Sequence, residues 1–103
     1  MKEIIIPDGV TSIGEFAFNY CKSLKTVTIP DSVTIIGGKA FTGCYELEEV
    51  FMGDGVETIG GSAFESCNKL FHVQFSENLK SIDSQAFWNC TMLEDVTLPV
   101  SVE

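Results

Sequence analysis

Four cysteines recur at a fixed interval, and this regularity restricts the fold more than any other feature of the sequence. Cys21, Cys44, Cys67 and Cys90 are each separated by 23 residues, with no insertion or deletion between them. An Ala-Phe pair precedes each cysteine at the same spacing, and a leucine follows three residues after it. Self-similarity at one period is the signature of stacked repeat units. We therefore predict one solenoid domain over residues 1–103, with about four and a half repeats.

Each repeat contains two predicted strands and a compact turn. Alternating apolar residues, as in Val27-Thr28-Ile29, predict a short strand, which Pro30 ends because proline cannot donate a ladder hydrogen bond. A second extended segment is predicted around Val33 and Ile36, and Gly37 indicates a bend after it. Residues 40–44, Ala-Phe-Thr-Gly-Cys, are too few for an independent helix, so we interpret them as one helical or 3₁₀ turn. The fold class is α/β-type and mostly β.

The whole unit has a recognisable form. Residues 21–44 read Cys-x-x-Leu-x-x-Val-x-Ile-Pro-x-x-Val-x-x-Ile-Gly-x-x-Ala-Phe-x-x-Cys. This pattern resembles the BspA-like, Treponema-type leucine-rich repeat family at nearly every fixed position. The resemblance implies a right-handed coil with a concave parallel sheet, in a bacterial protein that is secreted or on the cell surface. It also implies a protein partner, such as a host or cell-surface protein. The fixed residues of the family are core residues, so it implies no cofactor and no catalytic site.

Composition excludes several classes of partner. The formal net charge is −9, which would repel nucleic acid and anionic membrane surfaces. No apolar run approaches the roughly 20 residues that a membrane-spanning helix needs. No secretory leader is visible, since Met1-Lys2-Glu3 runs directly into strand-like isoleucines. We expect no membrane insertion and no nucleic-acid binding.

The cysteines allow three interpretations. Stacked repeats could bring neighbouring cysteines within bridging range for disulfides. Four thiols could also bind zinc, although a single file does not give the tetrahedral convergence that zinc requires. The interpretation that we favour is an inert column of small buried thiols, because the column lies among alanine, phenylalanine and leucine columns. These structural core cysteines are Cys21, Cys44, Cys67 and Cys90.

Two aromatic residues interrupt otherwise polar columns. Strand alternation predicts that Phe51 and Phe71 point outwards onto the concave sheet. Aromatic anchors with polar surroundings are typical of binding hot spots, although isolated exposed apolar residues are also ordinary. The candidate partner-binding residues of this face are Thr28, Glu49, Phe51, Phe71, His72, Gln74 and Asp95.

The single histidine lies within this candidate face. The repeat places His72 between Glu49 and Asp95, where it is either a pH-sensitive contact or an ordinary surface residue. A lone histidine without aimed partners does not make a catalytic triad. On the turn side, Trp88, Tyr20 and Tyr45 are expected to be exposed, with no role assigned.

The two ends also carry a prediction. Both cut through a repeat, at Met1 and at Glu103, which indicates a segment of a longer protein. Uncapped ends of a solenoid expose apolar columns, so we expect end-to-end association into a homo-oligomer. The leading functional hypothesis is a protein-binding or adhesion module. A structural spacer or self-assembling segment is the alternative, and an enzyme is disfavoured because no nucleophile–base pair, phosphate loop or metal cluster is present.

Overall fold

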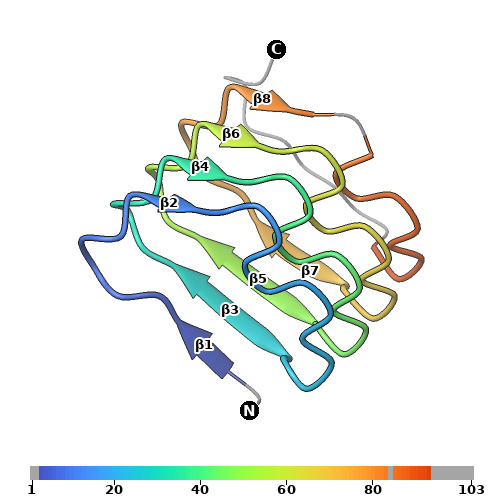
Figure 1. Ribbon diagram of the computed structural model, residues 1–103. Helices are drawn as coiled ribbons and strands as arrows, with labels where there is room; N and C mark the ends of the chain where they lie inside the picture. The colour runs from blue at the N-terminus through green and yellow to red at the C-terminus, as the bar shows by residue number, and fades with distance from the viewer. Residues whose placement is uncertain (1–2, 84, 94–103) are drawn as a thin grey trace.

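The computed structural model describes residues 3–83 and 85–93, and these residues form a parallel β-solenoid (Figure 1). Each turn of the solenoid, called a coil below, contributes one strand to each of two sheets. The first sheet has the order β1-β3-β5-β7 and the second has the order β2-β4-β6-β8. The strands of the first sheet are β1 (Glu3–Ile5), β3 (Thr26–Ile29), β5 (Glu49–Met52) and β7 (His72–Gln74). The strands of the second sheet are β2 (Ser12–Ile13), β4 (Ile35–Ile36), β6 (Thr58–Ile59) and β8 (Ser81–Ile82).

The pairing register equals the sequence repeat. Val27 of β3 pairs with Val50 of β5, and Ile36 of β4 pairs with Ile59 of β6, so each residue lies beside the one 23 positions later. All pairs are parallel, as the predicted solenoid requires. In β3, Val27 is fully buried while its neighbour Thr28 is only half-buried. The two predicted strands per repeat are therefore confirmed.

The turn segments differ from the sequence prediction. No helix is present among residues 3–83 and 85–93, so the helical or 3₁₀ turn expected at 40–44 is not found there. Instead, consecutive four-residue turns are closed by Ala40 N–H donating to Gly37 and Cys44 N–H donating to Phe41. Lys39 and Gly43 are the third residues of these turns and have φ of +60° and +73°, which is the mark of a type II turn.

The physical reason lies in where the N–H groups of this segment point. In residues 39–44, the N–H groups of Ala40, Thr42 and Cys44 close the local turns. The alternate N–H groups donate to the next coil instead, at 2.7 Å for Phe41 to Ala63 and 2.9 Å for Gly43 to Glu65. A helix would direct all of these donors back along its own chain. In this segment, hydrogen bonds between neighbouring coils therefore replace the hydrogen bonds of a helix.

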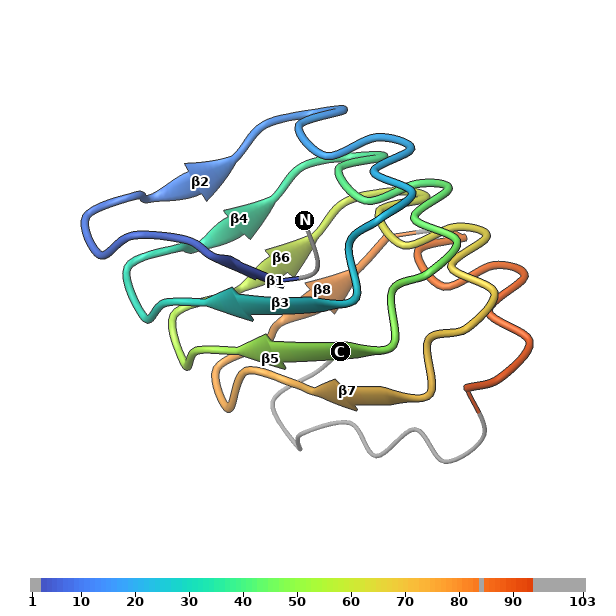
Figure 2. The ribbon, with the colours of Figure 1, turned by 90° about the horizontal axis from the view of Figure 1, so that it is seen from below.

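The interior is filled by one column of side chains from each repeat position. A stack of phenylalanine rings runs through it, with centroid distances of 5.1, 5.0 and 5.2 Å along Phe18, Phe41, Phe64 and Phe87. The strands of the two sheets lie on two sides of the solenoid, and the turn segments lie along another side (Figure 2). Val50, Leu47 and Ile59 are fully buried in the middle coil. The handedness of the coil and the concavity of the first sheet stay predictions.

Candidate protein-binding surface

The outer face of the first sheet is the side from which strand residues point away from the core. Its central column joins Thr28, Phe51 and Gln74, which lie in register on β3, β5 and β7. A second column joins Glu49 and His72 on β5 and β7. Parallel strands lie about 4.8 Å apart, so the residues in one column are close neighbours. The alternation thus brings five of the seven candidate residues together on one surface.

A ring contact on this face joins Phe51 and His72. Their ring centroids are 5.6 Å apart and their planes are tilted by 57°. This is a diagonal pair, because His72 lies in register with Glu49 and not with Phe51. Phe51 is half-buried beside this imidazole, whereas His72 and Gln74 are exposed. The face therefore has an aromatic centre within polar surroundings, which is the usual composition of a binding hot spot.

The second aromatic residue lies at the rim of the same face. Phe71 comes immediately before β7, with 52% of its surface exposed, and its N–H donates to the carbonyl of Glu48 at 3.1 Å. Phe71 and Met92 line a shallow depression together with polar side chains of the turn side; these are Glu48, Asn68, Lys69 and Thr91. Asp95, the remaining candidate residue, lies outside the described residues. Phe71 extends the apolar part of the face towards the turns.

Among the described residues, His72 forms no ion pair. Glu49 is its strand neighbour, yet no salt bridge joins the two side chains in the part of the chain that the structure describes. The ion pair between Lys69 and Glu46, at 3.0 Å, lies on the turn side and is exposed. Exposed pairs of this kind add little stability. Among the described residues, His72 has a ring contact with Phe51.

The four cysteines form a column that packs within or beside the core of the solenoid. Cys44, Cys67 and Cys90 are buried, Cys21 is half-buried, and all four thiols are free. The thiol of Cys67 donates to the carbonyl of Phe41 at 3.2 Å, and the thiols of Cys44 and Cys90 make the same bond to the preceding coil. Burial raises the pKa of Cys44 to about 11 and of Cys90 to about 11, and it raises the pKa of Cys67 further. A neutral thiol is a poor nucleophile and metal ligand.

Within residues 3–83 and 85–93, no cluster of three or more His, Cys, Asp or Glu side chains is arranged to hold a metal ion. No helix in that part of the chain has the length and apolar character needed to cross a membrane.

Several exposed apolar side chains lie away from the candidate face. On the turn side, Tyr20 and Tyr45 contact each other with ring centroids 6.2 Å apart, and Trp88 is 56% exposed. Ile35 is 49% exposed on the second sheet, and the sequence analysis did not single it out. Val33 and Ile36 both point inwards, although they are three positions apart and strict alternation would place them on opposite faces. Because Ile35 directly precedes the inward Ile36 in the strand, it points outwards, and this could have been predicted from the sequence.

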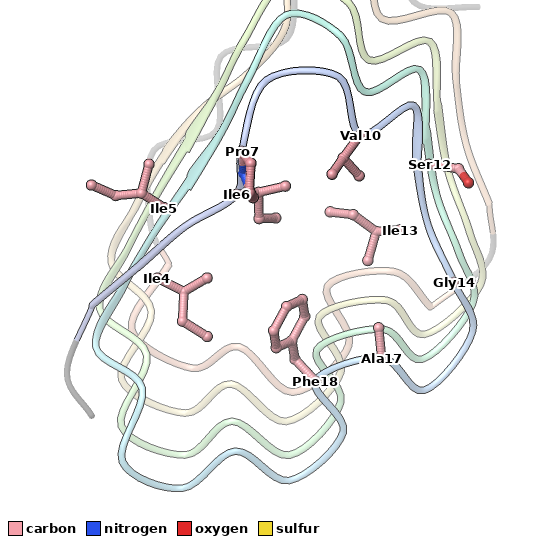
Figure 3. Close-up of a pocket in the computed structure, with 10 residues that line it drawn as sticks. All are labelled: Ile4, Ile5, Ile6, Pro7, Val10, Ser12, Ile13, Gly14, Ala17 and Phe18. Atoms are coloured by element: carbon pink, nitrogen blue, oxygen red, sulfur yellow. The ribbon is translucent and has the colours of Figure 1, made fainter.

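The first coil surrounds an apolar hollow of about 300 Å³ at the N-terminal end of the solenoid. Figure 3 shows Ile4, Ile6, Val10 and Phe18 pointing into its middle, while Ile5 points away. We call it the N-terminal hollow; its other lining residues are Pro7, Ser12, Ile13, Gly14 and Ala17. It is the inside of the solenoid seen from its N-terminal end, where inward side chains of the first coil line the hollow.

The repeat, its parallel register and its cysteine column can now be compared with known proteins. The model of the BspA type leucine rich repeat region matches residues 1–103. The chain belongs to the BspA-type leucine-rich repeat family. This confirms the resemblance predicted from residues 21–44. A search of the curated proteins finds no match.

Several solved structures share the fold. A leucine-rich repeat protein of T. pallidum has a TM-score of 0.94 and 37% identity over 98% of this chain and 50% of its own. A leucine-rich repeat protein of Eubacterium ventriosum has a TM-score of 0.93 and 36% identity over 99% of this chain and 28% of its own. The pneumococcal vaccine antigen PcpA has a TM-score of 0.58 and 27% identity over 85% of this chain and 32% of its own. This BspA-type chain thus spans half or less of the length of these proteins.

Proposed function

We propose that this chain is a protein-binding module of a secreted or cell-surface bacterial protein, and that it contacts its partner through the outer face of the first sheet. The observation that carries the proposal is the Phe51–His72 ring pair at the centre of that face, with exposed Phe71 at its rim. Leucine-rich repeat folds commonly serve protein interaction, and one similar structure is that of a vaccine antigen. The net charge of −9 favours a partner with a basic surface.

The test combines capture of a partner with substitution of the two anchors. A photoreactive phenylalanine at position 51 or 71 should cross-link a protein from a mixture of host cell-surface proteins. The same group at position 35, exposed on the second sheet, is the matched control and should not. The captured protein is then purified, and its affinity is measured by calorimetry. We expect Phe51→Ala and Phe71→Ala each to weaken binding at least tenfold, while Ile35→Ala leaves it unchanged.

Equal binding by Phe51→Ala, Phe71→Ala and the unsubstituted chain would place the contact elsewhere. A second candidate function is a structural spacer, which the unbroken 23-residue register favours because a uniform stack transmits length without needing a ligand. Under that alternative, none of the three photoreactive positions captures a protein, while the longer parent protein still binds its target.

A further inference from the structure

We propose that the shallow depression beside Phe71 binds an arginine side chain, which the protein partner supplies. The inference rests on the proposed function and names the chemistry recognised at one edge of the same surface. We call this feature the Phe71 depression; its lining residues are Glu48, Asn68, Lys69, Phe71, Thr91 and Met92. Its volume of about 550 Å³ lies within the range of roughly 300–1,000 Å³ for pockets that bind small ligands, so it has room for a long side chain.

The Phe71 depression lies along the side of the solenoid. Its lining comes from three successive repeats, because Glu48 precedes β5, Phe71 precedes β7 and Met92 belongs to the repeat after that. Backbone hydrogen bonding between repeats holds it in place, since the N–H of Phe71 donates to the carbonyl of Glu48 at 3.1 Å. The backbone of the site is therefore arranged before a ligand arrives, which lowers the entropic cost of binding.

The charges of the lining favour a cation. Lys69 is the basic residue of the lining, and its ammonium group donates to both carboxylate oxygens of Glu46, at 3.1 and 3.0 Å. Within residues 3–83 and 85–93, Glu48 forms no ion pair, either with Lys69 or with Lys25, its neighbour one repeat earlier. The lysine of the lining is thus already neutralised, and the carboxylate of Glu48 is available to a ligand of opposite charge.

The apolar part of the lining favours arginine over other cations. Phe71 and Met92 each leave 52% of their surface exposed to solvent. A guanidinium group stacks on an aromatic ring and forms paired hydrogen bonds with a carboxylate, and its aliphatic stem packs on apolar side chains. The ammonium group of lysine is more strongly hydrated and acts as a point charge. Glu48 would therefore bind the guanidinium, while Phe71 stacks on it and Met92 contacts the stem.

The test uses a small probe, so that it needs no identified partner. The probe is N-acetylarginine methylamide, whose guanidinium is its only charge, and it is titrated into the full chain and followed by NMR. We expect saturable shifts of the Met92 methyl and Phe71 ring signals, with a millimolar dissociation constant. The citrulline counterpart has nearly the same shape without the charge and should bind about fivefold more weakly, as the loss of one exposed ion pair predicts. The lysine counterpart should lie between the two.

Variants assign the preference to one carboxylate. Glu48→Gln should bind the arginine and citrulline probes equally, whereas Glu49→Gln, which makes the same change in net charge outside the lining, should keep the preference. Lys25→Gln removes a neighbouring positive charge and should strengthen arginine binding. Circular dichroism checks that each variant is folded.

Three results would overturn the proposal. They are the absence of saturable shifts at Phe71 and Met92, equal binding of the arginine and citrulline probes by the unsubstituted chain, which would indicate an apolar occupant, and an undiminished preference in Glu48→Gln. The cross-linking at positions 51 and 71 tests the proposed function separately. A captured partner without arginine binding would overturn this inference alone, and arginine binding without a captured partner would count against the proposed function alone.

Discussion

The rings of Phe41 and Phe64 lie parallel, with centroids 5.0 Å apart and planes within 2° of each other. The two residues are 23 positions apart in the sequence and fully buried. Parallel rings at this centroid distance are offset, which is a favourable arrangement for aromatic pairs. Phe64 continues the stack to Phe87 at 5.2 Å, so it contacts a ring on each side. Each coil therefore depends on both neighbours for its packing.

Phe64→Ala should be among the most destabilising single substitutions in the chain. It removes both ring contacts and leaves a cavity that the rigid coils on either side cannot fill. We expect a loss of about 3–5 kcal/mol in the free energy of unfolding, measured by urea denaturation. Trp88→Ala, which removes a large but 56% exposed side chain, is the control and should change stability by at most about 0.5 kcal/mol. Similar losses in the two variants would contradict the stacked core.

Gly60→Ala should destabilise the chain, whereas Gly14→Ala should not. A β-carbon at Gly60 would lie 2.5 Å from the backbone nitrogen of Gly38 in the preceding coil, and backbone cannot move aside cheaply. At Gly14, the same repeat position in the first coil, nothing lies within 4 Å of the added atom. We expect thermal unfolding to show a cost of about 1–3 kcal/mol for Gly60→Ala. Gly14→Ala should stay within about 0.5 kcal/mol of the unsubstituted chain. Equal effects of the two substitutions would show that the close approach of the coils does not require glycine at position 60.

The sequence predicts the columns of this fold well because the positions that point into the core carry apolar residues in every repeat. Val27, Val50 and Cys67 lie where the 23-residue period places them, since a fixed period leaves one consistent stacking register. The turn segments were harder to predict. Their left-handed positions are occupied by ordinary residues such as Phe16 and Lys39, with φ of +62° and +60°. Left-handed backbone is usually signalled by glycine, so the sequence does not indicate it at Phe16 and Lys39, although it does at Gly43.

For the candidate surface, too, some features can be predicted from the sequence and others cannot. Alternation predicts that Phe51 faces outwards, because one face of the strand must be buried. The contact of Phe51 with His72 depends on side-chain rotamers across a diagonal, which the repeat does not specify. The repeat does predict that Glu49 is the strand neighbour of His72, and the register confirms it. Column membership can therefore be predicted from the sequence, and contacts between columns cannot.

Chemical labelling should distinguish Cys21 from the other three cysteines. Cys21 is half-buried, while Cys44, Cys67 and Cys90 are buried and donate to carbonyls of the preceding coil. Brief exposure of the native chain to iodoacetamide should modify Cys21 first, as mapped by mass spectrometry of peptides. After unfolding in guanidinium chloride, all four should react. Modification of Cys67 in the native chain as fast as Cys21 would mean that the column opens readily.

Stability should fall between pH 9 and pH 11 because of the buried thiols. Burial raises the pKa of Cys44 from 9.0 to about 11, whereas in the unfolded chain the thiol titrates near its ordinary value. The folded state therefore holds its proton at a pH where the unfolded state has lost it. The stabilising contribution is fully present below pH 9 and is lost as the pH rises towards 11. For Cys44 alone, the loss by pH 11 should be about 2–3 kcal/mol.

The contribution of one thiol can be isolated by comparing the chain with a Cys44→Ala variant. Lysine and tyrosine residues also titrate in this range, but they are present in both proteins and their effects cancel in the difference. We expect the variant to be less stable at pH 7, because it loses a packed side chain and the hydrogen bond to Phe18. Between pH 9 and pH 11 the gap between the two should narrow, since only the unsubstituted chain loses the contribution of a neutral Cys44. Urea denaturation at several pH values measures the difference in the free energy of unfolding between the two proteins. A difference that does not change with pH would show that Cys44 ionises equally in the folded and unfolded states.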